Sequence, residues 1–522
     1  MKPEQTHKYF GIANKYILIV IVGLMFAGLA IGQYSSVTAD YFFGDGSNLT
    51  NLNAGYTYIV YNDTATGIVY AIPGGKSGTS FSGNATQALR YALNSSGIIH
   101  VRPGTYNVTN LTINFSNTIL EGEGWGTIIR QQDNVTLNAS GAPSPDIISP
   151  ALGVGNILIR DLMVDGNART NNATTRTVAS NGVGIETVLN NAGAITGNIT
   201  IDNVWVNDTI RTGIVVRNNV FVRNSKITNS KNDHPIYYSV SHNASVKDSV
   251  IGGIYDTELV TFGTSSGSGA YDVVFEGNTV NGIVVNDHPQ TTLLSIRDGS
   301  ENVTIKNNKI FIDALPALLQ SAIADGGNST KIINNEIYGK VNDGDSSGLI
   351  ITNGGLVLGN YLYGLNSGTY SGIRIAANTN DLVVSNNMLR NIGYNGIRFF
   401  SSSAASFWRN VSVNNNYIES GSHQVRIYGA AFTLGNNVTI YNNFFKPITS
   451  ETGIFVATAT DNSVKTNNYG SAPYYWGVYS AAPSAFGAGD TYYDSDLTNL
   501  CVASAAGTGN WLEVKDMITA CS

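Results

Sequence analysis

The sequence predicts an all-β, right-handed, single-stranded parallel β-helix of about 14–16 coils. A short phrase of alternating apolar residues around an Asn pair returns at a nearly constant interval, and a second apolar strand recurs in register with it. Only 12% of the 522 residues are charged, so Asn, Ser, Thr and Gly take much of the surface. A repeat of this length is typical of solenoid proteins, and alternation with period 2 indicates strands rather than helices.

The Asn phrase is clearest in the second half of the chain. Its copies are VTIKNNKIFI, KIINNEIYG, LVLGNYLYG, LVVSNNMLRNI, VSVNNNYIES and VTIYNNFFKPI. The Asn residues of successive copies lie about 25–29 residues apart. Asn tolerates the left-handed conformation of a bend and has a side-chain amide to donate to the next coil. We therefore expect an Asn at each bend to form an internal ladder.

The second strand recurs as LLSIRDG, AIADGG, LIITNGG, GIRIAAN, GIRFFSS, QVRIYGA and GIFVATA. Its central apolar residues are expected to stack in one inward column: Ile296, Ile323, Ile351, Ile375, Phe399, Ile427 and Val456.

Residues 68–470 are assigned to the β-helix, 34–67 to a linker and 471–522 to a C-terminal cap. The open end of such a stack would pair with other chains unless it is covered. A short amphipathic helix with Ala88, Leu89, Ala92 and Leu93 on one face precedes the first strands and is interpreted as the N-terminal cap. Cys501 and Cys521 are close enough in sequence to close a small terminal loop by a disulfide.

The first 33 residues are predicted to be a signal peptide or a membrane anchor. Lys2, Lys8 and Lys15 precede the uncharged apolar segment 16–32. A helix of that length is at the short limit for crossing a bilayer, and small residues near its end suit a cleavage site before Gln33. Both alternatives stay open, and both place the remainder outside the cell, because the positive flank stays in the cytoplasm.

Glycosylation sequons agree with an extracellular, N-glycosylated protein, either secreted or anchored at the cell surface. The Asn-x-Ser/Thr pattern occurs at Asn48, Asn62, Asn84, Asn94, Asn107, Asn110, Asn114, Asn134, Asn138, Asn172, Asn198, Asn207, Asn243, Asn302, Asn328, Asn410 and Asn437. Composition alone accounts for more than half of them, whereas the crowding before Asn207 exceeds that expectation.

Composition excludes several function classes. A net charge of −7 and the lack of a long basic run argue against nucleic acid as a partner. Two Cys residues are too few for a disulfide framework, a Cys₄ zinc site or an iron–sulfur cluster.

One candidate catalytic cluster lies just before the second strand. Matching Ile236 with Val260 of the next coil places His234 beside Glu258, with Asp233 and Asp256 adjacent. The tetrad Asn-Asp-His-Pro returns with Asp287 and His288, which are expected to bind substrate. A neutral His paired with a carboxylate is able to abstract a proton from a sugar ring. The alternative is a loop corner in which Asp-His-Pro only fixes a turn.

Two further columns of side chains are expected on the coils. Asp298 and Asp325 occupy the same phrase 27 residues apart, and paired carboxylates at coil spacing would hold Ca²⁺, the one candidate cofactor. Arg374, Arg398 and Arg426 take one outward position on three successive coils, which suits the carboxylates or sulfates of an acidic glycan. Ordinary turns and a solvated basic stripe are the respective alternatives.

The opening coils resemble those of the pectin-lyase-like superfamily, with its PbH1-type repeats. The resemblance rests on the cap helix, the segment RPGTY at 102–106, LEGEGWGTIIR at 120–130 and ILIRDLMVDGN at 157–167, and it covers about residues 68–470. It implies a right-handed parallel β-helix but no single activity. The corner at His234 is similar to alginate-epimerase active sites, although those carry Asp-Pro-His and this sequence has Asp-His-Pro.

A shorter resemblance, GDGSNLTNL at 44–52, is to segments of phage tail fibres and large microbial surface proteins, and it implies a fibre that is trimeric or packed with surface-layer neighbours. Two functions are therefore predicted. In the first, the protein binds polysaccharide or assembles as a surface fibre or adhesin. In the second, it is a polysaccharide lyase or C5-epimerase acting on a uronate polymer.

Overall fold

The computed structural model describes residues 55–75, 79–133, 146–168, 182–187, 197–231, 233–255, 258–264, 267–284, 291–313, 319–340, 347–365, 371–401, 406–429, 432–434, 438–448, 454–456, 460–461, 464–466, 468–470, 478–479, 491–494, 499–503 and 511–513. The chain divides into two units, residues 1–54 and 55–522. All described residues lie in the second unit.

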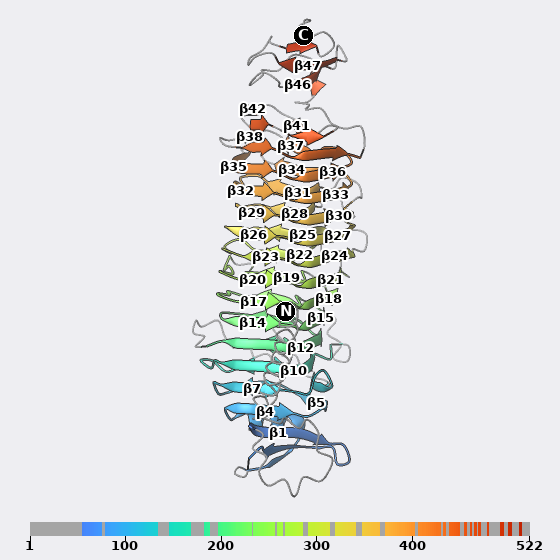
Figure 1. Ribbon diagram of the computed structural model, residues 1–522. Coiled ribbons are helices and arrows are strands. Elements are labelled where there is room, and N and C mark those ends of the chain that lie inside the picture. The colour runs from blue at the N-terminus through green and yellow to red at the C-terminus, as the bar shows by residue number, and fades with distance from the viewer. Residues whose placement is uncertain are drawn as a thin grey trace, which may run out of the picture. The chain divides into compact units, whose positions relative to one another are not determined.

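The coils of this unit follow one another in chain order, so each strand pairs in parallel with the strand one coil later (Figure 1). Each typical coil contributes three short strands, and the stacked strands form three faces. The predicted parallel β-helix is therefore confirmed. The third face alone is a 13-stranded sheet with one strand from each coil.

The first face consists of β4 (Gly97–Val101), β7 (Thr118–Glu121), β10 (Ile157–Asp165), β12 (Ile199–Thr209), β14 (Val220–Arg223), β17 (Ser245–Lys247), β20 (Val274–Glu276), β23 (Thr304–Lys306), β26 (Thr330–Ile333), β29 (Gly355–Leu358), β32 (Asn380–Ser385), β35 (Ser406–Asn414), β39 (Thr439–Tyr441) and β43 (Val464–Thr466). Two short strands, β38 (Phe432–Leu434) and β42 (Thr460–Asp461), extend the pairing of β35.

The second face consists of β5 (Gly104–Val108), β8 (Thr127–Gln131), the later parts of β10 and β12, β15 (Lys226–Ser230), β18 (Val250–Tyr255), β21 (Thr279–Val284), β24 (Lys309–Asp313), β27 (Glu336–Lys340), β30 (Tyr361–Tyr363), β33 (Met388–Ile392), β36 (Tyr417–Ser420), β40 (Phe444–Pro447) and β44 (Tyr469–Gly470).

The third face consists of β6 (Leu111–Ile113), β9 (Ile148–Pro150), β11 (Ile185–Glu186), β13 (Ile214–Val216), β16 (Ile236–Tyr238), β19 (Val260–Phe262), β22 (Thr291–Ile296), β25 (Leu319–Asp325), β28 (Ser347–Ile351), β31 (Ser371–Ala376), β34 (Asn395–Ser401), β37 (Val425–Gly429) and β41 (Ile454–Val456). Near the C-terminus, β45 (Val478–Tyr479), β46 (Thr491–Asp494), β47 (Asn499–Ala503) and β48 (Trp511–Glu513) form a separate four-stranded sheet.

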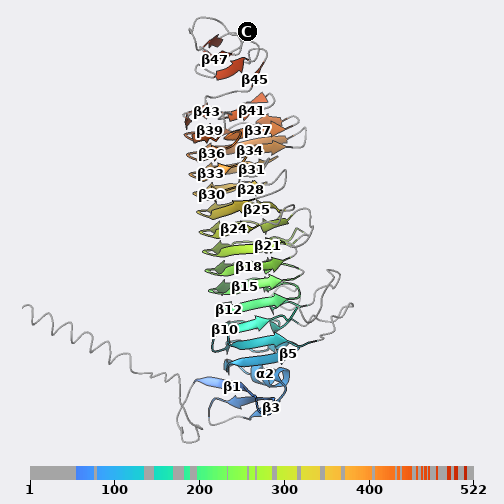
Figure 2. The ribbon, with the colours of Figure 1, turned by 90° about the vertical axis from the view of Figure 1, so that its right-hand side faces the viewer.

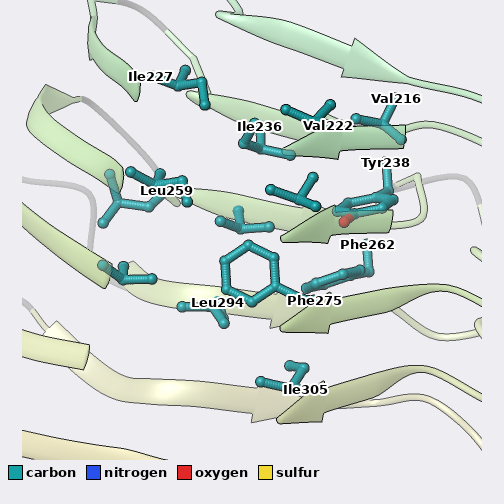
Figure 3. Close-up of a cluster of buried hydrophobic side chains, with 14 of the residues drawn as sticks. Val216, Val222, Ile227, Ile236, Tyr238, Leu259, Phe262, Phe275, Leu294 and Ile305 are labelled. Atoms are coloured by element: carbon teal, nitrogen blue, oxygen red, sulfur yellow. The ribbon is translucent and has the colours of Figure 1, made fainter. Parts of the chain in front are cut away.

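The interior is filled by the inward side chains of all three faces. Figure 3 shows a part of this core, in which Tyr238 and Phe262 of the third face stack with ring centroids 4.5 Å apart. Phe275 of the first face meets Phe262 edge to face at 6.1 Å. Because each strand alternates inward and outward residues, the same alternation fixes which side chains are exposed.

A buried Asn ladder runs through the later coils at the bend between the first and second faces. The Oδ1 atom of Asn335 accepts bonds from the backbone N and the Nδ2 atom of Asn308, at 3.0 and 2.9 Å. Its Nδ2 atom donates to the carbonyl of Ile305 and to Oδ1 of Asn360, at 2.9 and 3.0 Å. The side-chain amide thus has all its partners inside the protein. The same pattern links Asn278, Asn308, Asn335, Asn360, Asn387, Asn416, Asn443 and Asn468.

The two roles expected of one bend Asn are divided between neighbours. The first Asn of a pair, such as Asn334 with φ 52°, takes the left-handed conformation and lies at the surface. The second, such as Asn335, is buried and forms the ladder. The buried position therefore needs the Asn amide, whereas the exposed position needs a residue that tolerates positive φ, which is Gly277 or Gly359 on other coils.

Three sequon residues form a second column, at the bend that enters the first face. Asn243, Asn302 and Asn410 have φ of 49°, 54° and 50°. The Nδ2 atom of each donates to an Asn or Asp one coil earlier at 2.5–2.9 Å. The following Ser or Thr lies two residues further along the coil, so the coil pattern itself produces the sequon spacing at these positions.

The N-terminal end carries a helix and an antiparallel hairpin (Figure 2). Helix α2 (Ala85–Leu93) buries Ala88, Leu89, Ala92 and Leu93, and it contacts β5 and β6 of the first coil. Before it, β1 (Tyr56–Asp63), β2 (Ile68–Pro73) and β3 (Phe81–Gly83) pair antiparallel, and β1 also pairs in parallel with β4. Strand β1 lies in the segment assigned to a linker, so ordered structure begins earlier than the repeat pattern indicates.

Several predictions concern residues outside the described part of the chain. They are the apolar segment 16–32, the phrase at 44–52 and Cys521, the expected partner of Cys501. Among the described residues, no helix has both the length and the apolar character needed to cross a bilayer.

Candidate functional site

The predicted corner at His234 lies where the chain enters the third face. Ile236 pairs with Val260, as the sequence register predicts, so His234 immediately before β16 lies beside Glu258 immediately before β19. The ring of His234 lies 5.4 Å from that of Tyr237, which follows the inward residue Ile236 in β16. The side chains of His234 and Glu258 are each only 12% exposed.

On one side, the His234 ring is held by an anchored carboxylate. The Nε2 atom of His234 lies 3.0 Å from Oδ1 of Asp233. The other oxygen of Asp233 accepts from Nε of Arg211 at 2.8 Å and from the hydroxyl of Thr212 at 3.1 Å. Asp233 is therefore fixed by the preceding coil.

On the other side, the ring meets the next coil. The Nδ1 atom of His234 lies 3.0 Å from the carbonyl oxygen of Glu258 and 3.5 Å from its Oε2 atom. The hydroxyl of Thr261 is 3.3 Å from the same nitrogen. Arg297 donates to Oε1 of Glu258. A chain of alternating charges thus runs from Arg211 to Arg297.

These contacts favour the cationic form of His234. Burial opposes the charge, but the carboxylates of Asp233 and Glu258 outweigh it and hold the pKa of His234 above its usual value. Burial likewise opposes ionisation of Asp233, but His234 and Arg211 hold the pKa of that carboxyl well below its usual range. A cationic imidazole with both nitrogens engaged is a positioning group or a proton donor, whereas a general base must be neutral.

Three residues of the predicted site, Asp256, Asp287 and His288, lie outside the described residues. Arg211 and Arg297 complete the cluster but were not predicted. The repeat register places Thr212 one coil before His234, so the neighbouring Arg211 could have been predicted from the sequence. Arg297 was not, because it reaches back from the far end of β22 to Glu258.

The predicted pair of Asp298 and Asp325 is wrong. Asp325 pairs with Ile296 and with Ile351, so it occupies the inward column and not the position after it. The central apolar column is corrected accordingly, because Ile323 pairs with Leu294 and Leu349. Asp298 is exposed on its turn. The pairing of β22 with β25 is thus shifted by two residues from the one that the sequence motif predicts. In the observed register Ser321 pairs with Thr292, and their hydroxyls lie 3.1 Å apart.

Asp325 is instead a buried carboxyl group, 2% exposed. Its Oδ1 atom accepts from the backbone N of Gly327 and the hydroxyl of Thr330, both at 2.9 Å. Burial raises the pKa of Asp325 to about 7, and these two hydrogen bonds only partly offset it. The donor set expected for Ca²⁺ is not assembled here, and the described residues contain no group of three or more His, Cys, Asp or Glu side chains placed to hold a metal ion.

The predicted arginine column is formed in direct register. Arg374 pairs with Arg398, and Arg398 pairs with Arg426, on the outward side of β31, β34 and β37. The ring of Phe400 lies 4.4 Å from the guanidinium carbon of Arg374 and 4.2 Å from that of Arg398. Arg426 donates to the hydroxyl of Tyr394 at 2.7 Å. Arg398 is only 8% exposed, so the column is ordered by its neighbours.

A charged column on the first face was not predicted. Outward positions of eight successive coils hold His100, Glu121, Arg160, Asp202, Arg223, Lys247, Glu276 and Lys306. Neighbours are bridged, for example Arg160 to Glu121 at 2.5 Å and Lys247 to Glu276 at 3.1 Å. These contacts join coils to each other, which is a structural role.

The chain is similar to solved structures of parallel β-helix proteins. The catalytic unit of an α-1,3-glucanase from Streptomyces thermodiastaticus is 15% identical, with 75% of this chain and 66% of that one covered and a TM-score of 0.44. The A-module of a mannuronan C-5 epimerase from Azotobacter vinelandii is 16% identical, with 75% and 93% covered and a TM-score of 0.38. A polygalacturonase from Erwinia carotovora is 14% identical, with 74% and 94% covered and a TM-score of 0.36. No protein-family model and no curated protein matches the sequence.

Proposed function

We propose that this chain is an extracellular β-helix protein that binds an acidic polysaccharide along the arginine column. The observation that carries the proposal is the direct register of Arg374, Arg398 and Arg426 on three successive coils. Strand spacing places like charges about 4.8 Å apart in such a column. Three cations so close together attract a polymer that carries regularly spaced anions.

The chemistry of the column suits carboxylate or sulfate groups. A guanidinium presents a planar fork of N–H donors that matches both anions. The Phe400 ring against two of these groups and the Tyr394 hydroxyl against the third hold the side chains in place. Order before binding lowers the entropy lost when a ligand is captured.

Extracellular location is part of the proposal. It is supported by the Lys residues before segment 16–32 and by the sequons crowded into the N-terminal half. Assembly as a surface fibre or adhesin, with three copies or with surface-layer neighbours, is the finer form of the same proposal. Sedimentation of the purified full chain tests it directly.

Binding to anionic and neutral polymers tests the main proposal. Alginate, polygalacturonate and dextran are each titrated against the full chain at low and high salt. We expect binding to the two anionic polymers that weakens as salt rises, because salt screens charge. Arg374→Ala and Arg426→Ala are each expected to weaken binding about tenfold, which corresponds to about 1.4 kcal/mol for one lost charged contact.

Arg409→Ala is the matched control. Arg409 also lies over an aromatic ring, that of Phe407 at 4.6 Å, but it is on the first face and outside the column. Unchanged binding in Arg409→Ala with weakened binding in the column variants supports the proposal. Equal effects of all three variants, or no binding to either anionic polymer, would refute it.

The alternative function is a polysaccharide lyase or C5-epimerase that uses the corner at His234. The observation in its favour is that Asp233, His234 and Glu258 meet with Arg211 and Arg297, which supplies a proton-transfer group beside two cations. The cationic state of His234 requires it to act first as an acid, or to lose its proton before acting as a base.

Incubation with alginate and polygalacturonate, with and without chelator, tests this alternative. Unsaturated chain ends or inverted C5 centres indicate catalysis. A His234→Gln variant is expected to abolish such activity and to leave polymer binding at the arginine column intact. Full activity in that variant would remove the corner from the mechanism.

A further inference from the structure

A row of six aromatic rings and one Met lies on the second face, far along the chain from the corner at His234. Six successive strands, β24, β27, β30, β33, β36 and β40, contribute to it. We call it the aromatic stripe, and it consists of Phe311, Tyr338, Tyr361, Tyr363, Met388, Tyr417 and Phe444.

The strand register makes the row continuous. Phe311 pairs with Tyr338, which pairs with Tyr363. Tyr361 is the other outward residue of β30, two residues before Tyr363. It pairs with Met388, which pairs with Tyr417, and Tyr417 pairs with Phe444. The row therefore crosses from one outward position to the other at the strand β30.

The rings contact one another along the row. Phe311 and Tyr338 stack with centroids 5.6 Å apart, and Tyr338 meets the ring of Tyr361 edge to face at 5.8 Å. Tyr417 and Phe444 stack at 5.3 Å with an interplanar angle of 8°. These separations lie within the range of favourable aromatic pairs.

The row is exposed and rests on a rigid base. Phe311, Tyr363, Met388 and Phe444 are 38%, 43%, 44% and 46% exposed. The residues next to them in the strands point inward and are buried: Ile310, Ile337, Leu362, Leu389, Ile418 and Phe445. A contiguous apolar surface of this kind marks an interaction site.

Charges of both signs lie along the stripe, and each of its three cations is paired with one of two carboxylates. Lys309 lies 3.7 Å from Glu336, and both Arg390 and Lys446 lie 3.5 Å from Glu419. The hydroxyls of Tyr338 and Tyr417 bond to the same two carboxylates, at 2.8 and 3.3 Å. The surface therefore complements a ligand without net charge, in contrast to the arginine column.

We propose that the aromatic stripe binds a neutral polysaccharide chain, with sugar rings laid over successive aromatic rings. A pyranose ring has an apolar face of C–H groups that packs on an aromatic face, and hydroxyls at its edge that bond to Tyr, Glu and Arg. A repeating sugar chain matches a row that repeats with the coils. A second copy of this chain fits less well, because the core of such interfaces is depleted of charge, and Glu336, Arg390 and Glu419 lie within the stripe.

Affinity electrophoresis of the full chain in gels that contain dextran, mannan or xyloglucan tests the inference. Retardation is expected with at least one of the three neutral polymers and is expected to persist at high salt. Phe444→Ala and Tyr363→Ala should each weaken that binding about tenfold. Phe115→Ala is the matched control, because Phe115 is also 46% exposed but lies outside the stripe.

Two further measurements separate the occupants. Tyr363→Phe keeps the ring and should keep binding, whereas Tyr363→Leu keeps an apolar side chain without a ring and should weaken binding as Tyr363→Ala does. Sedimentation of the same variants reports self-association. No retardation in any neutral gel, equal retardation of Tyr363→Leu and wild type, or stripe variants that only convert an oligomer to a monomer would overturn the inference. None of these results bears on the arginine column, whose ligand is anionic.

Discussion

Replacing Asp325 by Asn should change how the stability of the β-helix depends on pH. The carboxyl of Asp325 is 2% exposed, and burial raises its pKa to about 7. An unperturbed Asp has a pKa near 3.8. The difference of about 3 units corresponds to about 4 kcal/mol, since each unit is worth about 1.4 kcal/mol.

The sign follows from which state binds the proton more tightly. Between about pH 4 and pH 7 the folded state retains a proton on Asp325 that the unfolded state has lost, so the free energy of unfolding falls as pH rises. Above about pH 7 both states are ionised, and the full cost of about 4 kcal/mol is present. Asn has no charge to bury, so this dependence disappears in Asp325→Asn.

The variant should therefore be more stable than wild type at pH 8 and no more stable at pH 4. The oxygen of the new amide is able to accept hydrogen bonds from Gly327 and Thr330. Its NH₂ group replaces an oxygen for which no acceptor is positioned, which lowers the free energy of unfolding by about 1–3 kcal/mol at any pH. The net gain at pH 8 is then about 1–3 kcal/mol. The cost of the amide cancels when the difference between variant and wild type is compared at the two pH values.

Urea denaturation of both proteins at intervals from pH 4 to pH 8 measures that difference. Hydrogen exchange of residues 319–340 is a local check, because repeat proteins also open coil by coil. A difference in unfolding free energy that stays constant within about 1 kcal/mol over this pH range would refute the reasoning.

Three further predictions concern stability. Asn335→Ala should lower the free energy of unfolding by more than about 3 kcal/mol in a thermal or urea melt, because it leaves several buried partners without a hydrogen bond. The variant of its exposed neighbour, Asn334→Gly, at φ 52°, should lower it by less than about 0.5 kcal/mol. Similar losses of stability in both variants would contradict the role of the ladder. His100 bonds to Glu121 and Glu123 at 3.1 Å, and the bond to Glu121 helps raise its pKa. The resulting stability should be present below about pH 6.5 and lost as pH rises through the folded pKa, and melts of His100→Gln should lack that step. Gly396→Ala should destabilise by about 1–3 kcal/mol, because its Cβ would overlap the side chain of Ile418 in the core; an unchanged melting temperature would contradict that packing.

The fold was predictable because its determinants repeat. An Asn preceded by Asn or Gly on each later coil, followed by alternating apolar residues, fixes both the bend and the strand that follows it, and comparing copies reveals the period. The antiparallel strands β1 to β3 occur only once, so they could not be found by comparing repeats. In the structure β1 pairs with β4, β2 pairs with β1 and β3 pairs with β2.

The candidate sites were predictable only where residues that match in similar sequence motifs are also the residues that pair between neighbouring strands. At Ile236 and Val260, and in the arginine column, the two coincide. At Asp325 the motif match pairs it with Asp298, but the strands pair it with Ile296, two residues earlier. The motif Ile-x-Asp-Gly belongs to a turn, and its place relative to the strand depends on the loop before it. Sequence also could not give the charge state of His234, which depends on carboxylates from two coils.

The buried Asn ladder has a consequence for how such a protein changes size during evolution. Every rung between Asn278 and Asn468 makes the same bonds to its neighbours, at separations of 25–30 residues. Duplication or excision of one rung with its coil leaves identical partners on either side of the new junction. Length is thus adjustable in whole steps, and each step on the later coils adds or removes one side chain from the surface rows.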